Sequence, residues 1–169
     1  MKTLLLTSFG YNRWATARIL KLAAELSDEQ LDAGGDHSHG SLRGLLFHMY
    51  RTEWIWRSLS QSGSLAGPRP KQSHVATLQA LQAAWEEEAG QMLSYLEGIS
   101  QADLDEKLEL TAPRGGTYSY TRWQMLHHLL LHSMGHRSET AAILTALDHS
   151  PGDLDLIYYL NEQNHPAEQ

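Results

Sequence analysis

Three observations predict an all-α fold, a four-helix bundle with one long connection between its third and fourth helices. Four segments of about 20 to 27 residues carry apolar side chains at helical spacing, enough for helices of roughly 30 to 40 Å. Stretches rich in Gly, Pro and Ser separate these segments. No repeat or shift in composition divides the 169 residues, so we expect residues 1–169 to form a single domain.

The first two long helices are predicted at residues 3–26 and from Ser41 to about Ser62. The apolar row of the first consists of Leu6, Phe9, Ala17, Leu20 and Ala24. Residues 27–30, Ser-Asp-Glu-Gln, have the pattern of a capping box and predict a short extra turn after it. Ser41 is a good N-cap for the second helix, whose apolar stripe includes His48.

The third and fourth long helices are predicted at residues 74–96 and 121–148. Pro68 and Pro70 exclude a helix from the linker before the third. Residues 99–120 are expected to be irregular, because Pro113 and two glycines mark a turn inside them. Residues 121–124, Thr-Arg-Trp-Gln, form a second capping-box pattern and begin the fourth helix. A short amphipathic segment at 154–160 is expected to close the fold.

The composition restricts the chemistry. The chain has 10 histidines and no cysteine, which excludes disulfides, thiolate zinc sites, iron–sulfur clusters and cysteine nucleophiles. With 13 Lys and Arg against 20 Asp and Glu, the net charge of −7 disfavours nucleic-acid binding. No window approaches the roughly 20 apolar residues of a membrane span, and residues 1–6 do not develop into a signal peptide. We therefore expect a cytoplasmic protein that does not bind a membrane.

The fourth helix carries the most informative pattern. Positions 125, 129, 132, 136, 139 and 143 advance by alternating steps of four and three, which predicts the seam that faces the bundle core. His132 and His136 lie on this seam, about 5–6 Å apart at Cβ, so both rings can reach one metal ion. Arg137 is expected to turn away from the seam. The His-Glu-x-x-His motif of zinc proteases is absent.

A third ligand must come from elsewhere, and His48 on the second helix is the natural candidate. Three inward imidazoles fit one divalent ion with an open position, although a lone inward histidine is more often a hydrogen-bonded core residue. Zinc is the first choice, with nickel or ferrous iron as alternatives. His128 could lie beside the ligands, and Glu139 could orient a ligand imidazole or pair with an arginine. His37 and His39 could line the mouth of the pocket, but we favour no role for them at the site.

Several motifs together carry a resemblance: residues 45–48, Leu-Leu-Phe-His; His132-x-x-x-His136-Arg137; residues 11–14, Tyr-Asn-Arg-Trp; and residues 150–155, Ser-Pro-Gly-Asp-Leu-Asp. The chain resembles the DinB/YfiT-like family of metal-binding four-helix bundles. The resemblance implies an up-down-down-up bundle, a homodimer, and a divalent ion held by His48, His132 and His136. Gly135 stands where many members have a further histidine, which puts the role of that imidazole in doubt here.

The resemblance also implies a function. Members with known activity are largely metal-dependent transferases or isomerases that use low-molecular-weight thiols such as bacillithiol, mycothiol or glutathione. We therefore expect a metal-dependent enzyme of the thiol S-transferase or isomerase type that acts on small molecules. The catalytic group would be the water or substrate thiol bound to the ion. The alternatives are a metal-dependent hydrolase, a non-catalytic metal-binding stress-response protein, and a bundle whose core histidines bind no metal.

Overall fold

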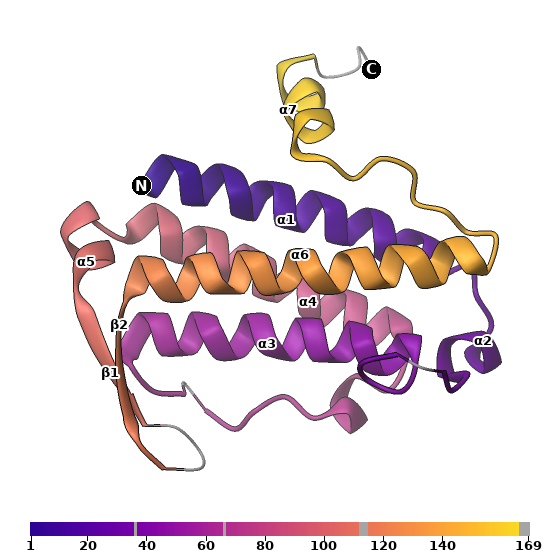
Figure 1. Ribbon diagram of the computed structural model, residues 1–169, viewed down its shortest axis with the longest axis horizontal. Coiled ribbons are helices and arrows are strands. Elements are labelled where there is room, and N and C mark those ends of the chain that lie inside the picture. The colour runs from indigo at the N-terminus through magenta and orange to yellow at the C-terminus, as the bar shows by residue number, and fades with distance from the viewer. Residues whose placement is uncertain (36, 66, 112–114, 166–169) are drawn as a thin grey trace.

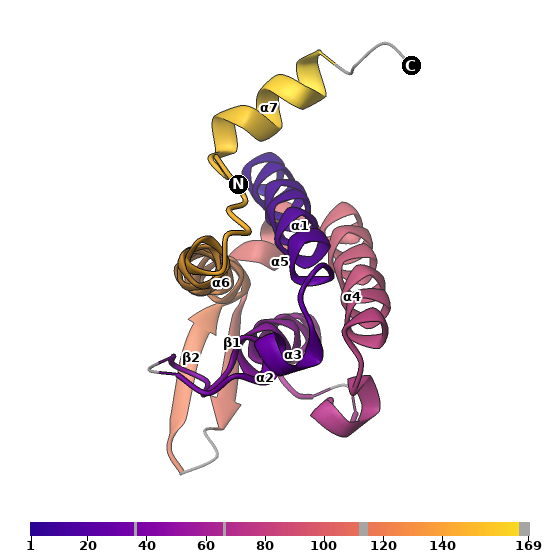
Figure 2. The same cartoon turned by 90° about the vertical axis from the view of Figure 1, so that its right-hand side faces the viewer.

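The computed structural model describes residues 1–35, 37–65, 67–111 and 115–165, and it is mostly helical. Four long helices lie side by side (Figures 1 and 2): α1 (Lys2–Ala23), α3 (Leu42–Ser62), α4 (Leu78–Gly98) and α6 (Arg122–Ala146). Both α1 and α3 contact both α4 and α6. Shorter elements connect them: α2 (Asp28–Asp32), the 3₁₀ helix η1 (Gln72–Val75), α5 (Gln101–Asp105), β1 (Lys107–Thr111), β2 (Thr117–Thr121) and α7 (Leu156–Asn164).

Long-range hydrogen bonds give the directions of the long helices. Lys2 at the start of α1 donates to the Glu97 carbonyl at the end of α4, so these two helices are antiparallel. Tyr95 late in α4 donates to the carbonyl of Ser60 late in α3, so α3 and α4 run the same way. Arg122, the first residue of α6, donates to the same carbonyl, so α6 opposes α3 and runs parallel to α1.

Three of the predicted helix starts are confirmed at their caps, whereas the third long helix begins at Leu78 and not at residue 74. Ser27 forms the expected capping box with Gln30 at the start of α2, and Thr121 forms another at the start of α6. The Ser41 hydroxyl accepts from the Gly44 N–H and begins α3. These side chains satisfy backbone donors that the first turn of a helix leaves free.

The prediction that residues 99–120 are irregular was wrong. They contain α5 and an antiparallel hairpin in which Leu110 pairs with Tyr118. The strand pattern was present in the sequence: β1, Lys-Leu-Glu-Leu-Thr, and β2, Thr-Tyr-Ser-Tyr-Thr, both alternate polar and apolar residues. Among these strand residues only Leu110 is buried, and β2 lies almost entirely exposed. The turn predicted at residues 113–116 lies partly outside the described residues.

Segment 154–160 was expected to close the fold, but α7 does not. It spans Leu156–Asn164, buries none of its residues, and projects from the four long helices (Figures 1 and 2). It packs mainly against α1. This helix consequently presents its apolar side chains to solvent.

The core consists of two apolar clusters with polar side chains between them. On α1, Leu5 and Phe9 belong to one cluster, and Ile19 and Ala23 belong to the other. Asn12 is buried between these pairs. Because a buried amide is costly without partners, the layer around Asn12 must be hydrogen-bonded.

The hydrogen bonds of this layer link all four long helices. The Asn12 side chain donates to Glu53 on α3 over 2.6 Å, and Trp85 on α4 donates to the other Glu53 oxygen over 2.8 Å. Arg137 on α6 donates to the Asn12 carbonyl oxygen. Arg137 was expected to turn away from the core, and this was wrong: it is only 3% exposed.

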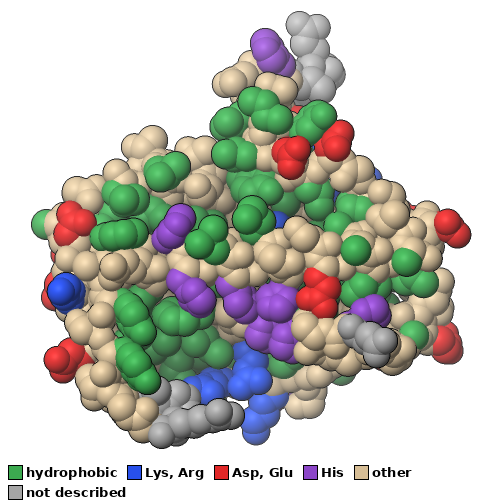
Figure 3. Space-filling model, viewed as in Figure 1, with side chains coloured by type: hydrophobic (Ala, Val, Ile, Leu, Met, Phe, Trp, Pro, Cys, Tyr) green, Lys and Arg blue, Asp and Glu red, His purple; other side chains and the backbone are tan. Residues whose placement is uncertain are grey.

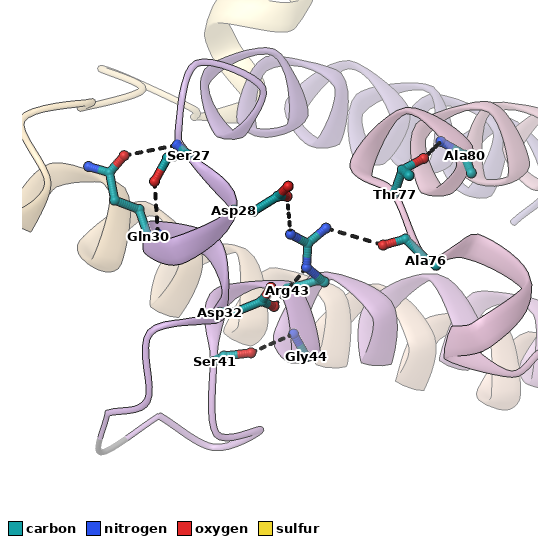
Figure 4. A network of polar contacts seen from close by, with 10 residues as sticks. All are labelled: Ser27, Asp28, Gln30, Asp32, Ser41, Arg43, Gly44, Ala76, Thr77 and Ala80. Atoms are coloured by element: carbon teal, nitrogen blue, oxygen red, sulfur yellow. Dashed lines mark hydrogen bonds and ion pairs between the residues drawn. The ribbon is translucent and has the colours of Figure 1, made fainter.

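Arg43 fixes the segment that precedes α3 (Figure 4). Its guanidinium pairs with Asp28 and Asp32 of α2 and also donates to the Ala76 carbonyl beyond η1. The arginine is buried although both carboxylates are largely exposed. One side chain thereby ties α2 and the η1 segment to the first turn of α3, which determines where the loop between α2 and α3 must run.

Candidate metal centre

Three histidines meet across the antiparallel pair α3 and α6. His48 lies on α3, and His132 and His136 lie one turn apart on α6. The Nε2 atoms of His48 and His132 are 3.1 Å apart, and the three ring centroids are separated by 4.5 to 5.1 Å. Two nitrogens about 2.0–2.1 Å from one tetrahedral ion would lie about 3.4 Å apart. The Nε2 atoms of His48 and His132 therefore stand close to the separation that a shared ion requires, and the ring of His136 lies beside both.

The site lies at the surface of the helix pair, not in the core as the sequence pattern suggested. The fully buried row of α6 consists of Leu126, Leu129, Ser133, Arg137, Thr140 and Leu144. His132, His136 and Glu139 lie beside this row and are partly buried. Figure 3 shows histidine side chains gathered on one face of the molecule, over α6 and α3. A small molecule could therefore approach the cluster from solvent.

A fourth histidine, for which we expected no role, lies on this cluster. The ring of His39, in the loop between α2 and α3, stacks on His48 with centroids 3.7 Å apart and planes inclined by 17°. One ring nitrogen each of His39, His48 and His136 lie within 4.8 Å of one another, whereas the predicted ligand His132 does not belong to this group. One signal for His39 was present in the sequence: Gly44, one turn before His48. A Cβ there would stand 2.4 Å from the His39 carbonyl oxygen, so the loop can approach α3 only beside a glycine.

Glu139 joins the loop to the cluster. Its carboxylate lies 3.1 Å from Nδ1 of His136 and accepts two hydrogen bonds of 2.8 Å from the backbone N–H and the hydroxyl of Ser38. Burial opposes ionisation of this group, but the hydrogen bonds from Ser38 and His136 outweigh it and lower the pKa of Glu139 to about 2. The carboxylate is thus ionised at neutral pH, which keeps the proton of His136 on Nδ1 and leaves Nε2 as the free donor atom.

The electrostatics favour neutral imidazoles. Burial, together with the neighbouring imidazoles, lowers the pKa of His48 and that of His132 to about 4. Burial also lowers the pKa of His39, and the proximity of His136 adds to this effect. Neutral imidazole is the form that binds metal ions, because the ligand needs a free lone pair.

Comparisons with known proteins identify the family of the chain. The model of the DinB family matches residues 1–168. The chain belongs to the DinB family. It is also similar to Protein DinB of Bacillus subtilis (strain 168), with 22% identity over 158 residues, which cover 90% of this chain and 91% of the relative.

Other sequence-predicted residues of this DinB-family protein lie at the edge of the cluster. His128 is exposed, its ring 4.8 Å from that of Trp56 and 6.1 Å from that of His132. Among the described residues, His128 forms no hydrogen bond with His48, His132 or His136, and its ring nitrogens do not belong to the close group formed by His39, His48 and His136. The buried Nδ1 of His132 has no hydrogen-bond partner in the described part of the chain.

Among the described helices, none is both long and apolar enough to cross a bilayer.

Proposed function

We propose that this DinB-family protein binds one divalent metal ion per chain through His48, His132 and His136. The observation that carries the proposal is the convergence of the three rings with mutually inclined planes, at 47°, 77° and 69°. Each imidazole donates in the plane of its ring, so rings that share an ion must have planes that meet at it. Zinc is the metal we propose first, and nickel and ferrous iron would accept the same donors.

We further propose that the protein is a metal-dependent enzyme of the thiol S-transferase or isomerase type, acting on small molecules. A divalent ion with an open position lowers the pKa of a bound water or thiol, which becomes the nucleophile. Membership of the DinB family supports the thiol chemistry. Because the chain has no cysteine, the thiol must arrive with the substrate. The net charge of −7 supports a small molecule rather than a nucleic acid as the partner, and we propose a cytoplasmic location.

The chain's own residues would bind and orient. The Glu139 carboxylate holds His136 through Nδ1, so that Nε2 faces the cluster. His48 approaches from α3, and its position is fixed by the packing of that helix against α6. The partly buried setting lowers the pKa of His48 and that of His132, which keeps these two imidazoles neutral, and it limits the access of water.

A conjugation assay tests the enzymatic proposal. Glutathione, bacillithiol and mycothiol would each be offered with a reactive electrophile to the metal-loaded protein and to the metal-stripped protein. We expect conjugation above the uncatalysed rate with at least one thiol, and only in the loaded protein. Equal rates in both forms would refute the thiol proposal. Metal-dependent ester hydrolysis without thiol turnover would favour the hydrolase, and metal binding without turnover the non-catalytic stress-response protein.

We also propose an up-down-down-up four-helix bundle that forms a homodimer. The directions of the four long helices support the topology. Exposed apolar residues on one side support the dimer: Met1, Leu4, Leu131, Met134, Leu156, Ile157 and Tyr158. All but Ile157 and Tyr158 line a hollow of about 420 Å³ between α1, α6 and the start of α7. This face carries both a projecting apolar helix and an apolar hollow, so a second copy can supply each with its partner across a two-fold axis.

Light scattering coupled to size-exclusion chromatography tests the dimer. We expect the mass of two chains for the wild type and of one chain for Leu131→Glu. The control is Tyr118→Glu, which places the same charge on an exposed aromatic residue of the hairpin and should leave the mass unchanged. A wild-type protein with the mass of one chain would refute the dimer.

A further inference from the structure

The loop between α2 and α3 is built so that His39 lies on the candidate metal centre. The Ser38 backbone and hydroxyl both bond to Glu139, the same carboxylate that contacts His136. Within the loop, the Gly35 N–H donates to the Gly40 carbonyl, and Gly40 takes the positive φ of 78° that turns the chain back toward α3. These contacts hold the backbone of His39 beside the cluster, whichever way its ring points.

The orientation of the His39 ring excludes it as a ligand in the arrangement described. An imidazole binds a metal in its own plane. The ring centroids of His39 and His48 are 3.7 Å apart and the ring planes are inclined by 17°, so the two planes meet only on the order of 10 Å away. His39 and His48 therefore cannot both coordinate one ion while their rings are stacked. The His39 ring would first have to rotate out of the stack. Its ring nitrogen has little distance to cover, since it already lies within 4.8 Å of donor atoms of His48 and His136.

We propose that His39 is a fourth, exchangeable ligand, which rotates out of its stack on His48 and closes the site when no substrate is bound. The inference rests on the proposed function, because it requires the ion. Four imidazoles complete a tetrahedral site and leave no position for substrate. The stacked position is then the open form, in which the His39 ring stands aside and the fourth position is free. The loop thereby governs access to the ion.

Cobalt(II) titration of the metal-free protein tests this, because its visible absorption is strong in four-coordinate sites and weaker when water raises the coordination number. We expect His39→Ala to bind Co²⁺ at least about tenfold more weakly than wild type, since even an outer partner of a ligand is worth roughly 10- to 100-fold. We expect weaker visible bands, which added imidazole should restore. His37→Ala, which removes the same side chain two positions away, should behave as wild type.

Gly44→Ala provides a second variant that removes no histidine. The added methyl would meet the His39 carbonyl oxygen at 2.4 Å and must push the loop away from α3. We therefore expect the Co²⁺ spectrum and affinity of His39→Ala. Gly90→Ala is the control, because a methyl there meets nothing within 4 Å.

The outcomes separate this inference from the proposed function. A wild-type protein that takes up no Co²⁺ would overturn both. If the wild type binds Co²⁺ while His39→Ala and Gly44→Ala keep its affinity and spectrum, only the role of His39 is overturned, and the three-histidine site stands.

Discussion

Glu53 should make the stability of the protein fall as the pH rises toward neutrality. Its side chain is buried between α1, α3 and α4. Burial raises the pKa of Glu53 from 4.5 to about 7, although hydrogen bonds from Trp85 and Asn12 act in the opposite direction. A folded-state pKa above the unfolded value means that the folded protein holds the proton more tightly. The stabilisation is complete below pH 4.5 and is lost as the pH rises through about 7.

The size of the effect follows from the difference between the two pKa values. About 2.5 pH units at 1.36 kcal/mol each correspond to about 3 kcal/mol of unfolding free energy. His48 and His132, whose pKa values are lowered to about 4, change stability in the opposite direction between about pH 4 and 6.5. The contribution of Glu53 must therefore be measured as a difference from Glu53→Gln, which cannot ionise and retains both histidines.

Urea unfolding followed by tryptophan fluorescence between pH 4.5 and 8 provides the assay. The unfolding free energy of wild type minus that of Glu53→Gln should fall by about 3 kcal/mol across this range. Glu86→Gln, which removes an exposed carboxylate on α4, is the control and should show no such trend. A difference between wild type and Glu53→Gln that does not change with pH would refute the reasoning.

Two further predictions concern stability. The Arg57–Glu88 ion pair is nearly fully buried, at 7% and 3% side-chain exposure, so Arg57→Ala should cost about 3–5 kcal/mol in urea unfolding. Arg13→Ala breaks the exposed Arg13–Glu86 pair, at 45% and 55%, and should cost about 0–1 kcal/mol; equal losses would contradict the burial argument. Gly135→Ala, where a methyl meets nothing within 4 Å, should raise stability by about 0.5–1 kcal/mol without changing metal affinity. A loss of metal binding there would show that the bare Gly135 position serves the site.

The sequence predicted best where a signal is local. The caps at Ser27, Ser41 and Thr121 were each correct, because a short side chain three residues before its backbone partner is visible without knowing the fold. The hairpin was missed because the turn residues between its strands outweighed the alternation of apolar and polar residues in Lys107–Thr111 and Thr117–Thr121. Long elements were therefore easier to predict than short ones.

The site shows the same limit. Helical spacing predicted His48, His132 and His136 as ligands, and their rings lie together, but whether they bind a metal stays a prediction. Met125 and Leu129 of the predicted seam of α6 are buried, whereas from residue 132 onward the buried face lies one position later. The α6 sequence carries apolar residues on several sides, so its pattern alone could not show that Arg137 is buried and that His136 is only partly buried. His39 was missed because loop geometry depends on tertiary contacts, here those of Gly44 and Glu139.

The most direct test of the central claim is the metal stoichiometry and affinity of the purified protein. Metal-free wild type would be titrated with Zn²⁺ beside His48→Ala, His132→Ala and His136→Ala, and circular dichroism would verify that each variant is folded. We predict one ion per chain for wild type and an affinity lower by at least about 100-fold in each variant. A folded His48→Ala protein that retains the metal content and affinity of wild type would contradict the assignment.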